Sequence, residues 1–178
     1  ATAFAQNPTL DWAVQMGGNS GGYSVGLSNT TDAAGNVYVT GLFQGTVDFD
    51  PGTGTMNLAA NGTNDIFVQK LAANGTLLWV RQMGGSDTDA AYSITTDAAG
   101  NVYILGDFRN TSDFDPGAGT MNLTSAGSSD IFIQKLDANG DFLWVRQMGG
   151  MGYDIGSSIT IDPLGNIITT GLFHDSVD

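Results

Sequence analysis

The stretch Gly35-Asn36-Val37-Tyr38-Val39-Thr40-Gly41 decides the fold, because it returns as Gly100-Asn101-Val102-Tyr103-Ile104-Leu105-Gly106 and as Gly165-Asn166-Ile167-Ile168-Thr169-Thr170-Gly171. The three copies begin at positions 35, 100 and 165, so they share one constant period. Aliphatic, β-branched and aromatic residues bounded by Gly and Asn are typical of a strand. A strand that recurs at one period predicts a repeat fold, in which each unit buries its apolar faces against its neighbours.

Other motifs recur at the same interval on both sides of this strand. Asp48-Phe49-Asp50-Pro51-Gly52 returns at residues 113–117, residues 65–70 return at 130–135, and residues 79–85 return at 144–150. A looser copy of the last motif, at residues 12–18, precedes its successor by slightly more than one period. The two extra residues fall within 19–31, where we expect a loop.

Each repeat is predicted to contain four strands. In the second repeat they are Tyr92–Thr96, Val102–Asp107, Asp130–Leu136 and Phe142–Met148. The long connection 109–129 is rich in Gly, Ser, Thr and Asn, and we expect a short strand at 121–123 within it. Runs such as Ile131-Phe132-Ile133 and Leu143-Trp144-Val145 are apolar on both alternating faces, which predicts a sheet covered on both sides. Small four-stranded sheets packed between their neighbours are the blades of a β-propeller.

Composition supports an all-β protein and excludes some partners. All 18 acidic residues are Asp and 26 of the 178 residues are Gly, which favours turns over helices. The net charge of -13 opposes binding to nucleic acid and to anionic lipid. No apolar run approaches the ~20 residues of a membrane-spanning helix, so we expect no membrane insertion. The absence of Cys excludes disulfides and a thiol nucleophile.

The motifs GNVYVTG, DFDPG, DIFVQK and NGxxxW, followed by MGG, recur in one order from Thr9 onward. This combination resembles the SBBP (seven-bladed β-propeller) repeat of exported bacterial proteins. The resemblance implies a propeller on a secreted or surface protein. The 65-residue unit is longer than the usual propeller repeat of ~40 to 50 residues.

The repeat phase predicts how the chain is divided. Residues 1–5 contain Ala3-Phe4-Ala5, a small-x-small sequence that we interpret as the remnant of a signal peptide. Residues 6–178 are then an incomplete propeller: an outer strand of a closing blade at 6–18, blades at 19–85 and 86–150, and half a blade at 151–178. Because closed rings have about 4 to 8 blades, we expect the chain to be the N-terminal part of a longer propeller.

Asp48 and Asp50, with their copies Asp113 and Asp115, are the strongest candidates for a metal site. Carboxylates at i and i+2 before a Gly could direct oxygens at Ca²⁺, which takes 6 to 8 oxygen ligands. No further Asp or Glu follows at the spacing of a calcium loop. Asp-Pro-Gly is also a turn sequence. We favour the turn, and expect no metal and no cofactor.

His174 is the only histidine, and it occupies the repeat position of Arg109 and Gln44. Unlike polar residues at one position suggest a solvated strand end rather than a catalytic base. Paired Asp residues could cleave a glycosidic bond, but catalytic groups in a ring of repeats should break the period, and most Asp residues here recur. We therefore assign no catalytic residue and expect no enzyme activity.

The expected function is that of a non-catalytic module, secreted or at the cell surface, that serves as a scaffold or binds a protein or glycan. This expectation rests on fold analogy. The alternative is the N-terminal part of an exported propeller hydrolase or lyase whose catalytic residues lie outside this chain. Uncovered blade faces and unpaired strand edges near Phe173 also predict self-association.

One register prediction can be checked directly. If Asn74-Gly75 forms a two-residue hairpin turn, counting outward pairs Lys70 with Trp79 and places the ammonium near the indole. The copies one period later, Lys135 and Trp144, should pair in the same way.

Overall fold

The computed structural model describes residues 12–17 and 22–175, and the ordered elements within them are all strands. No helix in this part of the chain is long and apolar enough to cross a membrane. The strands are β1 (Tyr23–Thr31), β2 (Val37–Gln44), β3 (Thr46–Asp48), β4 (Asn57–Ala59), β5 (Asp65–Leu71), β6 (Leu77–Gly85), β7 (Ala90–Thr96), β8 (Val102–Phe108), β9 (Thr111–Asp113), β10 (Asn122–Thr124), β11 (Asp130–Leu136), β12 (Phe142–Met148), β13 (Ile155–Ile161) and β14 (Ile167–Leu172).

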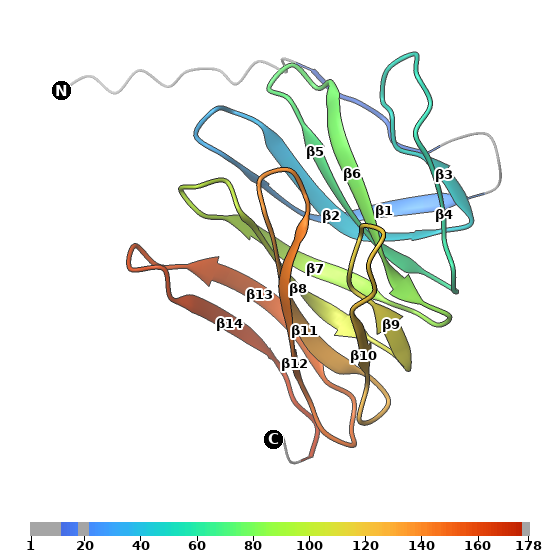
Figure 1. Ribbon diagram of the computed structural model, residues 1–178, viewed down its shortest axis with the longest axis vertical. Coiled ribbons are helices and arrows are strands. Elements are labelled where there is room, and N and C mark those ends of the chain that lie inside the picture. Colours follow the sequence, from blue (N-terminus) through green and yellow to red (C-terminus); the bar gives the residue numbers. More distant parts are fainter. Residues whose placement is uncertain (1–11, 18–21, 176–178) are drawn as a thin grey trace, which may run out of the picture.

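The strands form blades that repeat along the chain (Figure 1). Blade 1 pairs β1, β2, β5 and β6 in that order, and blade 2 pairs β7, β8, β11 and β12. The hairpin β13–β14 supplies the first two strands of a third blade. All pairs within the blades are antiparallel. The fold is therefore a partial β-propeller of four-stranded antiparallel blades with a 65-residue repeat, as predicted.

Two of the three hydrophobic clusters in the described residues lie between blades, which explains why the third strand of blade 2 is apolar on both faces. Phe132 packs into the cluster shared with blade 1, which includes Tyr38 and Ile66. Its neighbour Ile131 packs into the cluster shared with the third blade, which includes Ile159. The prediction holds less well for the outer strand, because Leu143 is 48% exposed. The outer edge of a blade is covered less completely than its middle.

A common turn closes the first hairpin of each blade. The turns at 32–36, 97–101 and 162–166 project to the same side of the molecule, on the left in Figure 1. In the second of these, the Gly100 N–H donates to Asp97 O (2.9 Å) and the Asp97 N–H donates to Asn101 O (3.0 Å). Gly100 has φ +80°, which an L side chain adopts only with strain. The Asp97 carboxylate accepts the N–H groups of Ala99 and Asn101 and so fixes the turn.

The outer hairpins use the same kind of turn, which corrects the predicted two-residue loop. Gly75 has φ +85°, and its N–H donates to Ala72 O (2.8 Å), as in the Asp-x-x-Gly-Asn turns. Leu71 then pairs with Leu77, and a bulge before the next pair leaves Leu78 without a partner in the register. Lys70 consequently faces Trp79, and Lys135 faces Trp144 in blade 2. The predicted register is confirmed, although the turn differs.

The Lys70 ammonium lies near the Trp79 indole, as predicted, because both donate to Ala138 O (3.3 and 3.2 Å), but the ring that it stacks on is that of a tyrosine. The Lys70 ammonium lies 4.9 Å from the centre of the Tyr38 ring, and the Lys135 ammonium lies 4.8 Å from that of Tyr103. The tryptophan rings are covered by arginine instead, with Arg81 5.5 Å from the centre of Trp79. The tyrosine lies on the neighbouring strand directly opposite the lysine. Lys70 therefore has an aromatic residue opposite it on each neighbouring strand, and its ammonium lies over the tyrosine ring.

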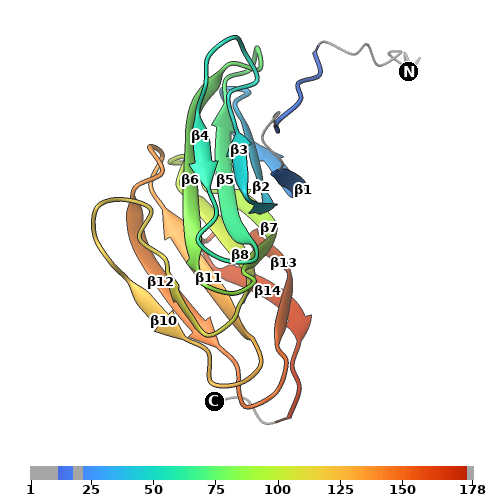
Figure 2. The same cartoon turned by 90° about the vertical axis from the view of Figure 1, so that its right-hand side faces the viewer.

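The long connections contain short hairpins on the side of the outer strands (Figure 2). The strand predicted at 121–123 is β10, shifted by one residue and paired with β9. The hairpin β9–β10 continues the sheet of blade 1, because β9 pairs with β6 through Gly84 and Gly85. These pairs join successive blades at their outer edge.

The predicted outer strand at 6–18 is described only at 12–17, and those residues are not part of a strand. Their contacts nevertheless follow the repeat. The Trp12 indole N–H donates to Ala73 O (2.8 Å), as the Trp79 indole N–H donates to Ala138 O (3.2 Å). Within the described residues, no strand lies beside 12–17 in the way that β5 lies beside β6. The signal-peptide remnant predicted at 1–5 lies outside the described residues.

Candidate functional site

The Asp-Phe-Asp-Pro-Gly motifs form tight turns in which each carboxylate binds backbone. Asp113 Oδ1 accepts the N–H of Asp115 (3.0 Å) and of Met121 (2.8 Å), and Asp115 Oδ1 accepts the N–H of Gly117 (2.8 Å). Asp48 and Asp50 make the same bonds in blade 1. These carboxylates cap loops, as the turn interpretation requires.

The phenylalanine of the motif anchors the turn in the core. Phe114 is fully buried and packs against Phe108 and Phe132, with ring centroids 5.2 Å and 4.9 Å away. The buried Gln134 donates from Nε2 to Phe114 O (2.6 Å). Phe49 and Gln69 repeat this bond in blade 1. The motif therefore fixes the long loop against its own blade, which accounts for its recurrence.

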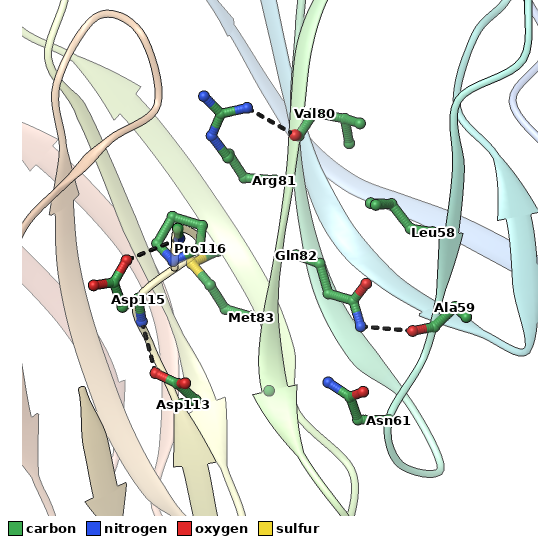
Figure 3. A pocket seen from close by; sticks show the side chains of 12 residues that line it. Leu58, Ala59, Asn61, Val80, Arg81, Gln82, Met83, Asp113, Asp115 and Pro116 are labelled. Carbon is green, nitrogen blue, oxygen red and sulfur yellow. Dashed lines mark hydrogen bonds between the residues drawn. The ribbon is translucent and has the colours of Figure 1, made fainter. Parts of the chain in front are cut away.

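The turn at Asp113 also forms one wall of a groove on the outer side of β6, which we call the rim groove (Figure 3). The groove has a volume of about 350 Å³. One wall carries Asp113, Asp115 and Pro116, while Leu58, Ala59 and Asn61 of blade 1 lie on the other side of β6. Residues 80–84 of β6 line its floor.

The polar side chains on the floor of the rim groove are already engaged. Arg81 donates from Nε to Gly140 O (3.0 Å) and from Nη2 to Asn139 O (2.7 Å), and so clasps the outer turn of blade 2. Gln82 donates to Ala59 O (2.8 Å) and to the Asp65 carboxylate (2.7 Å). The groove is thus a polar recess whose Arg81 and Gln82 side chains already have hydrogen-bond partners in the protein.

The described residues hold no group of three or more His, Asp, Glu or Cys side chains placed to bind a metal ion. His174 lies at the repeat position of Arg109, as the period predicts. Its backbone N–H donates to Asp154 Oδ1 (2.9 Å), and the Arg109 N–H donates to Asp89 Oδ1 (3.1 Å). The shared backbone bond is structural, so the side chain at this position is free to vary between blades.

Asp89 and Asp154 are fully buried and bind the loops that connect blades. Asp89 Oδ2 accepts the Gly85 N–H (2.7 Å), and its Oδ1 also accepts the Ser112 hydroxyl (2.9 Å). Burial raises the pKa of Asp89 to about 6, against the lowering effect of these hydrogen bonds. Asp154 accepts the equivalent Gly150 N–H (2.8 Å). These recurring carboxylates hold the blades together.

A different polar group lies between blade 2 and the third blade and does not follow the period. It consists of Tyr92, Asp107, Arg109 and Tyr153, which we call the interblade cluster. Arg109 donates from Nη2 to the Tyr153 hydroxyl (3.0 Å), and its guanidinium lies 5.4 Å from the centre of that ring. The Tyr92 hydroxyl lies close enough to the Asp107 carboxylate for each group to shift the pKa of the other. Asp107 is only 2% exposed, while the other three side chains are half-buried.

The charges of the interblade cluster act on one another. Burial raises the pKa of Asp107, against the lowering effects of the Tyr92 hydroxyl and the Arg109 charge. The hydrogen bond with Tyr153 raises the pKa of Arg109. Asp107 Oδ1 and Arg109 Nε are both buried and have no hydrogen-bond partner in the protein. Such groups destabilise a fold, so each calls for an explanation.

Sequence reasoning missed Tyr92, Asp107 and Tyr153, and considered Arg109 only as a counterpart of His174. The available signal for Tyr92, Asp107 and Arg109 was departure from the period, whereas Tyr153 repeats Tyr23 two periods earlier and gave no such signal. Asp107 stands where the other repeats have Leu42 and Leu172. Tyr92 and Arg109 stand where blade 1 has Leu and Gln, at 27 and 44.

Comparison with known families finds the SBBP β-propeller repeat at residues 78–107 and 143–172. The second matched segment begins one full period after the first. The first runs from β6 through β7 into β8, and the second runs from β12 through β13 to the end of β14. The sequence unit of the family therefore joins the outer strand of one blade to the two inner strands of the next.

Two relatives match most of the chain. An uncharacterized WD repeat-containing protein, L264, of Acanthamoeba polyphaga mimivirus is 26% identical over 91% of this chain and 13% of its own length. The regulatory protein FlaEY of Caulobacter vibrioides is 24% identical over 80% of this chain and 15% of its own length. The matched region is thus a small part of each of these relatives.

Proposed function

The chain carries two SBBP β-propeller repeats, and on this basis we propose that it is a non-catalytic binding module that presents its loops and grooves to a protein or glycan outside the cell. The repeat fold supplies a rigid frame, and the relative named for WD repeats supports a role as a repeat scaffold. Functions on propellers reside in sites placed on the fold rather than in the fold itself.

The observation that supports this proposal is that the recurring polar residues are hydrogen-bonded within the scaffold. Asp113 and Asp115 bind turn backbone, Asp97 fixes a hairpin turn, and Asp89 and Asp130 bind the loops that end blades. Each is engaged by the scaffold at its position in the repeat. Such groups build a stable surface, and they are poor candidates for general acids or bases, which must reach a substrate.

Export of the protein is part of the proposal. It is motivated by Ala3-Phe4-Ala5 and by the likeness to repeats of exported proteins. The test is expression of the complete gene in its host, followed by fractionation and protease treatment of intact cells. Protection of the protein from external protease, together with its recovery in the cytoplasmic fraction, would contradict export.

Binding without turnover is tested with the purified chain on arrays of bacterial polysaccharides and surface proteins. We expect saturable binding to at least one component, with no release of reducing ends or peptide fragments. The variants Arg81→Gln and Asp115→Asn change the rim groove, and they should alter binding if the partner lies there. Degradation of the bound component would favour the hydrolase or lyase alternative.

A further inference from the structure

The scaffold does not require a carboxylate at residue 107. Leu42 and Leu172 occupy the same position in the neighbouring repeats, and the hairpins β1–β2 and β13–β14 form there as β7–β8 does. A buried carboxylate destabilises a fold unless its oxygens are paired. Asp107 Oδ1 is unpaired. Leucine therefore suits the scaffold better at this position, and the presence of an aspartate needs an explanation other than stability of the fold.

A bulge in the first strand brings Tyr92 to this carboxylate. The register between β7 and β8 shifts between Ala91 and Ser93, so Tyr92 is the extra residue. The same bulge occurs in β1 and β13, where the extra residues are Leu27 and Ser157. Bulges redirect a side chain out of the regular alternation. Only the repeat that has Asp107 uses the bulge to present a hydroxyl to it.

The two unpaired atoms have opposite hydrogen-bonding character. Asp107 Oδ1 can only accept from a partner when it is ionised, and Arg109 Nε can only donate. Their charges are close enough for each to influence the pKa of the other. The negative charge of Asp107 would repel an anionic ligand, and the positive charge of Arg109 would repel a cationic one. A neutral ligand with adjacent hydroxyls satisfies both, because one hydroxyl donates to the carboxylate and the next accepts from the guanidinium.

The tyrosines complete a site of this kind. Tyr92 lies near the Asp107 carboxylate and Tyr153 contacts Arg109, and each of the two tyrosines is partly exposed to solvent. Aromatic faces suit the apolar face of a sugar ring, and their hydroxyls add further donors and acceptors. Because Asp107 Oδ1 and Arg109 Nε are both buried, a neighbouring side chain must move when a ligand reaches them.

We propose that Tyr92, Asp107, Arg109 and Tyr153 form a binding site for a neutral saccharide, with Asp107 accepting from one sugar hydroxyl and Arg109 Nε donating to its neighbour. This inference deepens the proposed function and rests on it, because it names a glycan as the ligand and one blade interface as its place. The site lies between blades, apart from the rim groove.

The test compares the full chain with a variant that restores the sequence of blade 1, Tyr92→Leu with Asp107→Leu and Arg109→Gln. The probes are the methyl glycosides of glucose, galactose and mannose, titrated by calorimetry and by saturation-transfer NMR. We expect saturable binding of at least one glycoside, weakened at least tenfold in the variant. The melting temperature of the variant should equal or exceed that of the wild type, since an unpaired buried charge is removed.

Two further variants separate binding from stability. Asp107→Asn keeps the shape of the side chain and should weaken glycoside binding with little change in melting temperature. Arg146→Gln removes an arginine that stacks on Trp144 on the outer strand of blade 2, and it should leave glycoside binding unchanged. Binding that is equal in the wild type and in the Asp107→Asn variant would overturn the site.

The remaining outcomes are also decisive. The absence of saturable binding of all three glycosides, or preferential binding of methylammonium or acetate at the cluster, overturns the saccharide assignment. A large fall in the melting temperature of the triple variant makes the cluster structural. Polysaccharide or protein binding that survives the triple variant preserves the proposed function and removes this site. If the triple variant loses glycoside binding and the wild type binds no polymer or protein on the arrays, the site is preserved and the proposed binding of a larger partner is contradicted.

Discussion

The buried carboxylate of Asp89 should make the stability of the protein depend on pH in an unusual direction. Its side chain is fully buried, and its pKa is raised from 3.8 to about 6, chiefly by burial. The folded protein therefore holds this proton more tightly than the unfolded chain. The contribution of Asp89 to stability is greatest below pH 4 and is lost as the pH rises to about 6.

The size of the effect follows from the shift. A displacement from 3.8 to about 6, at about 1.4 kcal/mol for each pH unit, corresponds to about 3 kcal/mol between pH 4 and pH 7. The variant Asp89→Asn has no titrating group. Its amide nitrogen cannot accept the Gly85 N–H, which costs about 1–3 kcal/mol at every pH. The difference in unfolding free energy between wild type and variant should therefore change by about 3 kcal/mol across this range.

The measurement is urea denaturation at pH 4, 5, 6 and 7, followed by tryptophan fluorescence. At pH 7 the two effects nearly cancel, and at pH 4 the wild type should be clearly the more stable protein. Asp154→Asn is the matched control, because it removes the equivalent acceptor of the Gly150 N–H in the next repeat without changing Asp89. Parallel pH profiles for wild type and Asp89→Asn would refute the argument that burial controls this group.

Other predictions concern the turns, the core and the outer faces. Calcium chloride should not raise the melting temperature beyond the effect of matched ionic strength; a saturable rise that Asp113→Asn abolishes would make Asp48, Asp50, Asp113 and Asp115 a calcium site. Gly100→Ala should destabilise the protein by about 1–2 kcal/mol in thermal unfolding because φ is +80°, and an unchanged melting temperature would contradict this backbone strain. Phe114→Ala should lower the free energy of unfolding, measured in denaturant, by about 3–5 kcal/mol because the ring is fully buried. Phe114→Leu should lower it by less. The purified chain should self-associate more at high salt, because Val25 and Leu27 of blade 1 are 40% and 42% exposed and screening weakens the repulsion of the -13 charge; light scattering that shows one monomer at all salt concentrations would contradict this.

The sequence by itself determined the blades. Gly100 requires a turn at a positive φ, the Asp97 side chain fixes that turn, and the apolar residues of 102–106 follow at once. These are local constraints, since each turn and strand depends on residues a few positions apart. Because they recur once in every period, one correct assignment extends to every repeat. The register of Lys70 with Trp79 was predicted correctly although the turn was not, because the bulge at Leu78 offsets the longer turn.

Only the tertiary structure decided which side chains meet between strands and between blades. The sequence alone does not determine which aromatic ring the Lys70 ammonium contacts, and packing places the ammonium over Tyr38. Likewise, Arg109 meets Tyr153, which lies 44 residues away on the next blade. Such contacts depend on how neighbouring sheets are stacked, and no local pattern encodes them. The period located the scaffold, and the packing of blades assembled the interblade cluster where the sequence departs from that period.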